Sequence, residues 1–354
     1  MKNAAKWNGI VLGGILGILG LIALFTMIID PFWHYHGPLK GLEYPLKEER
    51  YLNDGIARHE EYDAIITGTS MTQNFKPSQF DTLWNAKTIK IAFSGATYKE
   101  VNDNIVRALR YGQNVKYILR SLDGNKLILP ADRDEYEGYP DYLYDNNPFN
   151  DVSYLLNKEV IPKTLAVLNY TRAGNKTPDW DAYGSWGQYK VYGKEEVLRS
   201  SSRLEISEET YELTPEDEKN IQENIEKNVL TIAKEHPEIT FYLFFPPYSI
   251  SYWDALVRSG QLDAQLKAQK MAVELLLDAQ NIHIYAFEQD TSLTGNLDNY
   301  TDSLHYGPWI NEEILTKIRQ GEGELTKENY KEHFETVWEI YLQYPYDEVL
   351  YGQQ

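Results

Sequence analysis

Three residues that could together activate a hydroxyl group stand far apart in the chain: a serine, a histidine and an aspartate. Ser70 follows an apolar run at residues 63–67 and a Gly-Thr pair, a pattern that predicts a hydroxyl at the carboxyl end of a buried strand. A serine alone is a weak nucleophile and needs a base. Asp302 lies three residues before His305, so its carboxylate can orient the imidazole while the imidazole faces the serine. Ser70, His305 and Asp302 are therefore predicted to form a proton-relay triad for acyl transfer.

Acyl transfer also needs hydrogen-bond donors for the oxyanion that develops on the substrate. Gly95 follows the second predicted strand, so its backbone N–H can point into the same crevice as the N–H of Ser70. Asn125 lies in an Asp-Gly-Asn run after the third predicted strand and could donate through its amide. Asp123 of the same run is the alternative residue that could point inward. We predict an oxyanion hole built from Ser70, Gly95 and Asn125.

Two residues near these positions are candidates for substrate contact, and each also has a structural interpretation. Asn74 follows the serine closely enough to line the site, but it could equally cap a helix. Two prolines after the fourth predicted strand form a rigid loop that could present Tyr248 to a substrate, or the loop could be a simple strand exit.

The histidines do not form a pattern typical of a metal site. His34 and His36 alternate with Trp33 and Tyr35 just after a long apolar segment, which favours an interfacial belt over a pair of ligands. The chain has no cysteine, which excludes a thiolate zinc site and a disulfide framework. We predict neither a metal nor a cofactor.

Composition narrows the class of partner. The net charge of -19 argues against a nucleic-acid groove, which needs a basic stripe. The 28 tyrosines and 8 tryptophans suit contacts with sugars or with an interface, although packing explains any single one as well.

The order of apolar runs and amphipathic stretches predicts the fold. Short continuous apolar runs are typical of strands covered on both faces, and helical patterns separate them. The predicted strands are residues 63–67, 88–93, 115–119, 239–245 and 282–287. The predicted helices begin at a capping box at 97–100, at Thr214 and at Gln261. This alternation predicts a three-layer α/β/α sandwich with a five-stranded parallel sheet, flavodoxin-like in type.

Two segments fall outside this alternation. Residues 125–213, rich in Tyr, Asp, Asn and Gly, are predicted to be an insertion that acts as a lid, with a helical stretch at 152–168. Residues 327–354 are predicted to be one amphipathic helix that closes the domain, which itself spans 61–326.

The first 30 residues predict a cytoplasmic stub and a transmembrane anchor. Residues 7–29 carry no charge, about the 20 residues needed to cross a bilayer as a helix. Lys2 and Lys6 precede this run, which places the N-terminus in the cytoplasm and the rest outside. An uncleaved anchor is favoured over a removed signal peptide. Gly9, Gly13 and Gly17 recur every four residues and could let a partner helix approach closely, or they could simply be tolerated in a solitary anchor. Residues 31–60 are predicted to be a stalk.

The motifs resemble those of the SGNH/GDSL hydrolase superfamily, whose blocks carry the serine, a glycine, an asparagine and an Asp-x-x-His pair. The N-terminal anchor, the Gly-x-Ser block and Asp-x-x-His-x-Gly are similar to the membrane-anchored branch that includes the teichoic-acid D-alanylation protein D and the alginate O-acetylation proteins. In this chain Thr69 stands where the superfamily usually has aspartate, and residues 123–125 keep the types of the third block in a different order.

The resemblance implies an extracytoplasmic, single-pass plasma-membrane protein that acts as a serine O-acyl esterase or acyltransferase on a cell-envelope glycopolymer. It also implies two partners, the polymer or its acyl donor and a membrane-bound O-acyltransferase. The alternative is a non-catalytic accessory protein of such an acylation system, and a lipase-like hydrolase of membrane lipids is a third reading.

Overall fold

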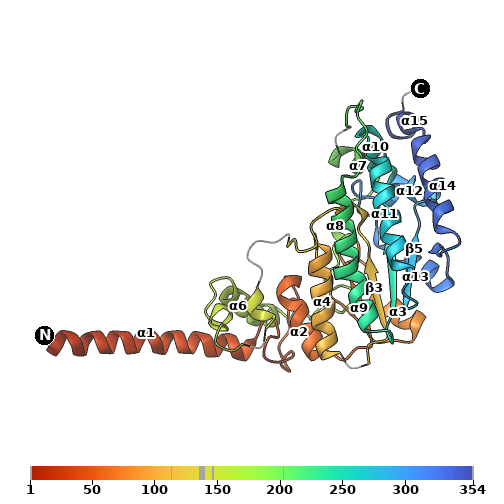
Figure 1. Ribbon diagram of the computed structural model, residues 1–354. Coiled ribbons are helices and arrows are strands. Elements are labelled where there is room, and N and C mark those ends of the chain that lie inside the picture. Colours follow the sequence, from red (N-terminus) through yellow and green to blue (C-terminus); the bar gives the residue numbers. More distant parts are fainter. Residues whose placement is uncertain (1, 113, 135–139, 146, 202, 353–354) are drawn as a thin grey trace. The chain divides into compact units, whose positions relative to one another are not determined.

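The computed structural model describes residues 2–112, 114–134, 140–145, 147–201 and 203–352 (Figure 1). Its contacts divide the chain into two compact units. The N-terminal unit comprises residues 1–60 and 138–179, and the sheet unit comprises 61–137 and 180–354. This division differs from the predicted one, because the middle of the predicted insertion belongs with the N-terminal segment instead of with the sheet.

The sheet unit is built on six strands in the order β2-β1-β3-β4-β5-β6. The strands are β1 (Ala64–Thr67), β2 (Thr88–Lys90), β3 (Tyr117–Ser121), β4 (Thr240–Phe245), β5 (Ile282–Ala286) and β6 (Glu324–Leu325). Strands β1 to β5 are parallel, and β6 pairs antiparallel with β5. The predicted α/β class and the five parallel strands are confirmed. The predicted strand number is corrected to six, since a two-residue edge strand leaves no apolar run in the sequence.

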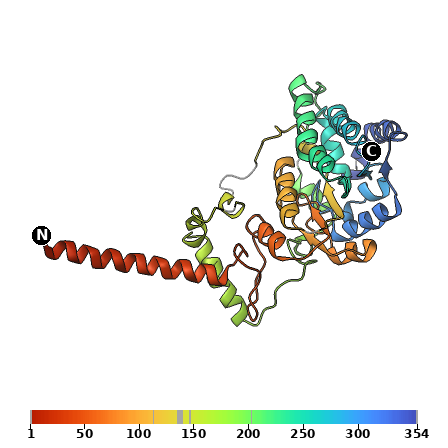
Figure 2. The same ribbon diagram turned by 60° about the horizontal axis from the view of Figure 1, so that its bottom comes forward.

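Helices cover both faces of the sheet (Figures 1 and 2). Right-handed crossovers place α4 (Tyr98–Tyr111), α8 (Pro215–Ile225), α9 (Thr231–Glu235) and α11 (Leu262–Leu276) on one face, and α3 (Pro77–Trp84) packs with α13 (Pro308–Gln320) on the other. Every residue of β1 and β2 is buried, as expected for strands covered on both sides.

Two helix starts follow directly from the sequence. Thr97 accepts a hydrogen bond from the N–H of Glu100, and the Glu100 carboxylate accepts one from Thr97, so α4 begins with a reciprocal capping box. The same arrangement of Thr214 and Asp217 begins α8, whose apolar stripe continues through the π turn η4 (Glu226–Leu230) into α9.

The remaining elements of the sheet unit are short helices and turns. They are η1 (Gly124–Lys126), η3 (Gly187–Tyr189), α7 (Lys194–Ser200), α10 (Ile250–Arg258), α12 (Thr291–Thr294), η5 (Leu297–Asn299), α14 (Tyr330–Leu342) and α15 (Tyr346–Tyr351). The predicted single C-terminal helix is therefore wrong, because the tail folds as two helices. Pro345 disfavours helical geometry at the residue before it and has no N–H to donate.

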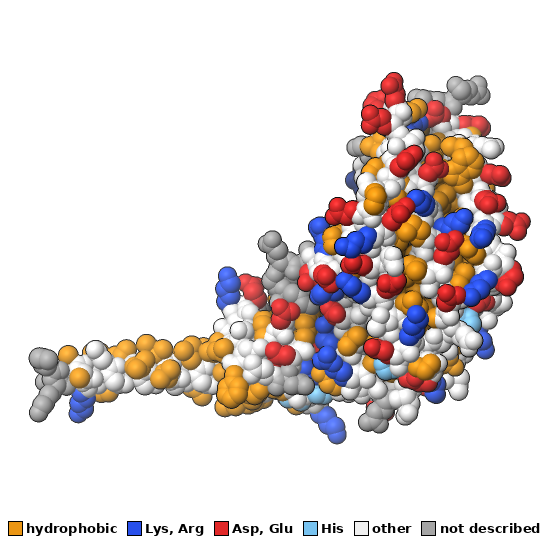
Figure 3. Space-filling view, in the orientation of Figure 1, with side chains coloured by type: hydrophobic (Ala, Val, Ile, Leu, Met, Phe, Trp, Pro, Cys, Tyr) orange, Lys and Arg blue, Asp and Glu red, His pale blue; other side chains and the backbone are white. Residues whose placement is uncertain are grey.

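The N-terminal unit contains α1 (Lys2–Ile29), α2 (Glu49–His59), η2 (Asp141–Leu143), α5 (Val152–Leu155) and α6 (Val160–Arg172). Residues Ala4–Ile29 of α1 form a helix of 26 residues that is long and apolar enough to cross a membrane. Figure 3 shows apolar side chains along this helix. A helix of this kind near an N-terminus is typical of a membrane anchor or of a signal sequence.

Asp30, at the end of α1, organises the chain that follows. Its carboxylate accepts hydrogen bonds from the backbone N–H groups of His34, Tyr35 and His36 at 3.0, 2.6 and 3.0 Å, and from the hydroxyl of Tyr154 at 2.7 Å. Residues 31–36 thus form a compact turn instead of the beginning of an extended stalk. His34 is buried within the unit, which corrects its expected place in an interfacial belt.

Candidate active site

Ser70 lies on the turn that follows β1, at the carboxyl edge of the sheet. The N–H and the hydroxyl of Thr72 both donate to the carbonyl of Thr69, at 3.0 and 2.8 Å, which closes a tight turn around the serine. Gly68 enters this turn with φ +140°, a conformation that favours glycine. Ser70 itself is half-buried and open on one side.

The structure brings the three residues of the predicted triad together. The Ser70 hydroxyl lies 2.8 Å from Nε2 of His305. On the other side of the ring, Nδ1 lies 2.8 and 3.0 Å from the two carboxylate oxygens of Asp302. These distances join serine, imidazole and carboxylate in one hydrogen-bonded chain, which is the arrangement that activates a serine nucleophile.

Contacts with neighbouring segments fix the loop that carries His305. Tyr300 and Tyr306 form an isolated antiparallel bridge across its base. The N–H and the hydroxyl of Ser249 both donate to the carbonyl of Ser303, at 3.1 and 2.9 Å. The loop after β4 therefore holds the histidine loop in place beside the serine turn.

Asp302 is held in its ionised form. Burial by itself raises the pKa of this carboxyl, but hydrogen bonds from the His305 ring and from the backbone N–H groups of His305 and Leu304 outweigh it and lower the pKa below its ordinary value. An ionised carboxylate accepts the Nδ1 proton and leaves Nε2 of His305 free to accept a proton from Ser70.

The strand register places Gly95 opposite Ser70. The N–H of Phe93 donates to the carbonyl of Gly68 at 3.2 Å, so Gly95 and Ser70 each lie two residues beyond this last pairing. Gly95 has φ +72° and is half-buried. Within the described residues, neither its N–H nor that of Ser70 donates a hydrogen bond to the protein. Both groups are thus available to an oxyanion.

Asp123 supports the serine turn from the exit of β3. Its buried carboxylate accepts hydrogen bonds from Thr69 at 2.9 Å, Ser121 at 2.7 Å and Tyr248 at 3.3 Å. Three hydroxyl groups donate to this carboxylate, so Asp123 positions the turn that carries Ser70.

Asn125, the third member of the predicted oxyanion hole, makes no described hydrogen bond to the triad. Its side chain is exposed and lines a pocket together with Tyr252 of α10 and Gln265 of α11. The two backbone donors, from Ser70 and Gly95, are the parts of the predicted oxyanion hole that the strand register supports.

The predicted substrate contact at Asn74 is corrected. This side chain is 2% exposed, and its Oδ1 accepts hydrogen bonds from the Ser185 hydroxyl and from the backbone N–H groups of Trp186 and Gly187, at 3.0, 3.1 and 2.9 Å. A fully engaged, buried amide oxygen cannot bind substrate. Asn74 instead ties residues 185–187 to the serine turn.

The predicted substrate contact at Tyr248 is corrected for the same reason. The side chain is 2% exposed, and its hydroxyl points to the Asp123 carboxylate. The prolines that precede it turn the tyrosine inward, where it helps to hold the serine turn.

An aromatic rim of three side chains, Trp186, Tyr192 and Trp309, lies beside the triad, and the sequence predicted its first two members only as part of the Tyr-rich insertion. The indole N–H of Trp186 donates to the carbonyl of Ser70 at 3.0 Å, and its ring meets the His305 ring edge-on at 5.2 Å. Tyr192 packs edge-on against the half-exposed Trp309 at 4.9 Å. Burial and, after it, the charge of Asp302 raise the pKa of Tyr192 to about 12. Trp186 and Tyr192 of the predicted lid thus lie beside the triad.

The structure offers no metal site in the regions it describes, since no three His, Cys, Asp or Glu side chains are grouped closely enough to hold an ion.

Replacing Gly68 with alanine is expected to destabilise the sheet unit by about 2–5 kcal/mol. The new Cβ would lie 2.5 Å from the Ser121 hydroxyl and 2.9 Å from Thr72, and φ +140° is strained for any residue with a side chain. Gly321→Ala is a matched control, because φ is +75° there but no atom lies within 4 Å, so about 1–2 kcal/mol is expected. Thermal unfolding checks both, and equal losses would contradict the steric argument.

Replacing Asn74 with alanine is expected to cost about 2–4 kcal/mol, because two backbone N–H groups and one hydroxyl lose their acceptor. The change should also loosen Trp186 and shift its fluorescence emission. Gln188→Ala, at an exposed position in the same segment, is the control and should leave both measurements unchanged. A normal emission spectrum in Asn74→Ala would show that this amide does not hold the segment.

Comparison with known proteins gives a distant structural likeness. No protein-family model matches the chain significantly, and no curated protein does. A solved structure from Streptococcus pneumonia, provisionally described as a platelet activating factor, matches with a TM-score of 0.40 and 11% sequence identity, over 78% of this chain and 92% of its own. The chain is an α/β protein with a mostly parallel six-stranded sheet and a Ser-His-Asp cluster at its carboxyl edge.

Proposed function

We propose that this protein is a membrane-anchored serine O-acyl esterase or acyltransferase that acts outside the membrane on a cell-envelope glycopolymer. The observation that carries the proposal is the hydrogen-bonded chain from Ser70 through His305 to Asp302, at 2.8 Å in each of its two links. The flavodoxin-like strand order and the placement of these residues after β1 and β5 support the resemblance to SGNH/GDSL hydrolases.

The reaction would proceed in two acyl transfers. Nε2 of His305 takes the Ser70 proton as the serine oxygen attacks the acyl carbonyl, and the N–H groups of Ser70 and Gly95 stabilise the oxyanion. The tetrahedral intermediate collapses to an acyl-serine ester, and the leaving alcohol receives the proton from His305. Water or a sugar hydroxyl then gives its proton to His305 and attacks the ester, and the second tetrahedral intermediate collapses as His305 returns the proton to the Ser70 oxygen, which frees the serine.

The setting of the site supports an envelope polymer as substrate. The long apolar N-terminal helix would hold the sheet unit beside the membrane. The aromatic rim of Trp186, Tyr192 and Trp309 suits the apolar faces of sugar rings, and it would limit access of water to an acyl-serine.

A genetic comparison in the organism of origin tests this proposal. Deletion of the gene should remove acyl groups from the envelope polymer, and a copy encoding Ser70→Ala should fail to restore them although the protein accumulates normally. Full restoration by the Ser70→Ala copy would contradict catalysis and would establish the accessory role instead.

A further inference from the structure

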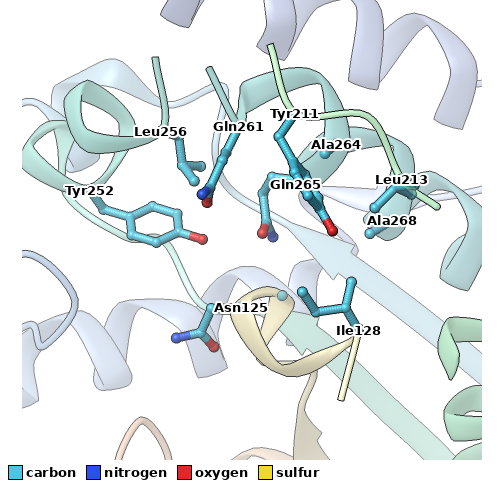
Figure 4. Close-up of a pocket in the computed structure, with 11 residues that line it drawn as sticks. Asn125, Ile128, Tyr211, Leu213, Tyr252, Leu256, Gln261, Ala264, Gln265 and Ala268 are labelled. Atoms are coloured by element: carbon cyan, nitrogen blue, oxygen red, sulfur yellow. The ribbon is translucent and has the colours of Figure 1, made fainter. Parts of the chain in front are cut away.

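Apart from the triad, the carboxyl edge of the sheet carries the pocket that Asn125 lines. This pocket lies between η1, α10, α11 and the segment before α8. It has a volume of about 170 Å³. Figure 4 shows the Tyr252 hydroxyl pointing toward the end of the Gln265 side chain, with Tyr211, Gln261 and Asn125 around them. All of these residues belong to the sheet unit.

Two buried polar atoms in this pocket have no partner in the described protein. The Tyr252 hydroxyl and Nε2 of Gln265 are both inaccessible to bulk solvent, and neither makes a hydrogen bond to the described chain. Gly124 lies directly against Gln265, since a Cβ there would be 2.5 Å from Nε2. Buried polar groups are almost always satisfied, so a water molecule or a bound ligand is expected to pair with these two atoms.

The remaining lining defines the chemistry of such a partner. The polar lining residues, Asn125, Tyr211, Tyr252, Gln261 and Gln265, are all uncharged, and the others are Leu, Ile, Ala and Gly. A phosphate or a carboxylate would be buried here without a compensating cation, which is costly. Amides and phenols offer both donors and acceptors, and the aliphatic wall suits C–H groups. This combination fits a neutral molecule that carries several hydroxyl groups.

A short chain of contacts connects this pocket to the serine turn. The Tyr252 ring meets the Tyr248 ring edge-on at 4.7 Å, and the Tyr248 hydroxyl donates to Asp123. Asp123 in turn accepts from Thr69, the residue before Ser70. The pocket and the triad therefore share one edge of the sheet and one set of supporting side chains.

We propose that this pocket is a binding subsite for a neutral sugar residue. Its hydroxyl groups would accept from Nε2 of Gln265 and exchange hydrogen bonds with the Tyr252 hydroxyl. The binding of a sugar here does not depend on the proposed function. Only the further statement, that this sugar belongs to the polymer on which Ser70 acts, rests on it.

Saturation-transfer NMR on the full chain in lipid nanodiscs tests the subsite, with D-glucose and N-acetyl-D-glucosamine as probes and inorganic phosphate for comparison. At least one sugar should receive saturation, and phosphate titrated into the same sample should not displace it. Tyr252→Phe and Gln265→Leu should each lower the affinity for the sugar by about tenfold or more, as loss of a buried hydrogen bond does. The control variant is Tyr189→Phe, because Tyr189 is 80% exposed and does not line the pocket. This variant should bind the sugar with the wild-type affinity.

Folding and catalysis are followed separately in the same samples. Tyr252→Phe removes a hydroxyl that has no protein partner, so its thermal stability should equal or exceed that of the wild type. Labelling of Ser70 by a serine-directed probe should be unchanged in both variants, because Tyr252→Phe keeps the ring that packs against Tyr248 and Gln265 makes no described contact with the triad. Absence of saturation from both sugars, or equal saturation in Tyr252→Phe and the wild type, would overturn the subsite. If the wild-type protein binds sugar but its Ser70 is not labelled, only the proposed function is overturned and the subsite stands.

Discussion

Replacing Ser70 with alanine is expected to lower ester hydrolysis by roughly 10⁴-fold or more, because no acyl-enzyme can form without the nucleophile. The Ser70 hydroxyl is the group 2.8 Å from Nε2 of His305, and the alanine removes only that oxygen. Release of 4-nitrophenol from 4-nitrophenyl acetate by the full chain in detergent micelles gives the rate. Because Ser70 makes no described contact that supports the turn through its hydroxyl, the variant should unfold at the wild-type temperature.

Ser292→Ala is the matched control for this experiment. Ser292 is exposed, and its described hydrogen bond is to Asp290 at 2.5 Å, outside the triad. Its rate should equal that of the wild type. Hydrolysis that persists in Ser70→Ala at a rate within a few-fold of wild type would assign the activity to another group.

Replacing Asp302 with asparagine is expected to lower the turnover rate by about 10³–10⁴-fold with little change in substrate binding. An asparagine amide can donate to Nδ1 of His305, which would move the ring proton to Nε2, where it faces Ser70. The ring could then no longer accept the serine proton. The amide oxygen can still accept from the N–H groups of Leu304 and His305, so the loop should keep its shape. Steady-state kinetics that separate kcat from KM test this.

The low pKa of Asp302 also predicts how the variant responds to acid. Because the pKa is lower in the folded chain than its ordinary value, this carboxylate stabilises the fold above that ordinary value, and the contribution disappears as the pH falls through the depressed pKa. Between pH 6 and pH 3 the wild type should therefore lose more thermal stability than Asp302→Asn. An equal loss would mean that the carboxylate is not held ionised by the loop.

The parts of the fold that follow local patterns could be predicted from the sequence. Strands β1 to β5 overlap the five nearly continuous apolar runs of the sequence, and α4 begins at a capping box that is visible as Thr97 and Glu100. The Ser70 and His305 positions follow from the same runs, because the carboxyl ends of parallel strands meet at one edge. Strand β6 and the break at Pro345 depend on only one or two residues each, too few to produce a periodic signal.

The direction in which a side chain points could not be predicted from its neighbourhood. Asn74 and Tyr248 lie near the serine as expected, but tertiary contacts turn both inward, to residues 185–187 and to Asp123. The N-terminal unit likewise depends on a pair 124 positions apart, the hydrogen bond between Tyr154 and Asp30. No local sequence pattern in residues 31–60 or 138–179 predicts such a pairing.

Covalent labelling of the full chain by a fluorophosphonate probe tests the central claim, an activated serine at position 70, most directly. Intact-mass and peptide analysis should show one adduct on Ser70 in the wild type, no adduct in Ser70→Ala, and labelling slowed by at least about 10³-fold in His305→Ala. A folded wild-type chain that takes up no probe, or one that is labelled equally well without His305, would contradict the triad.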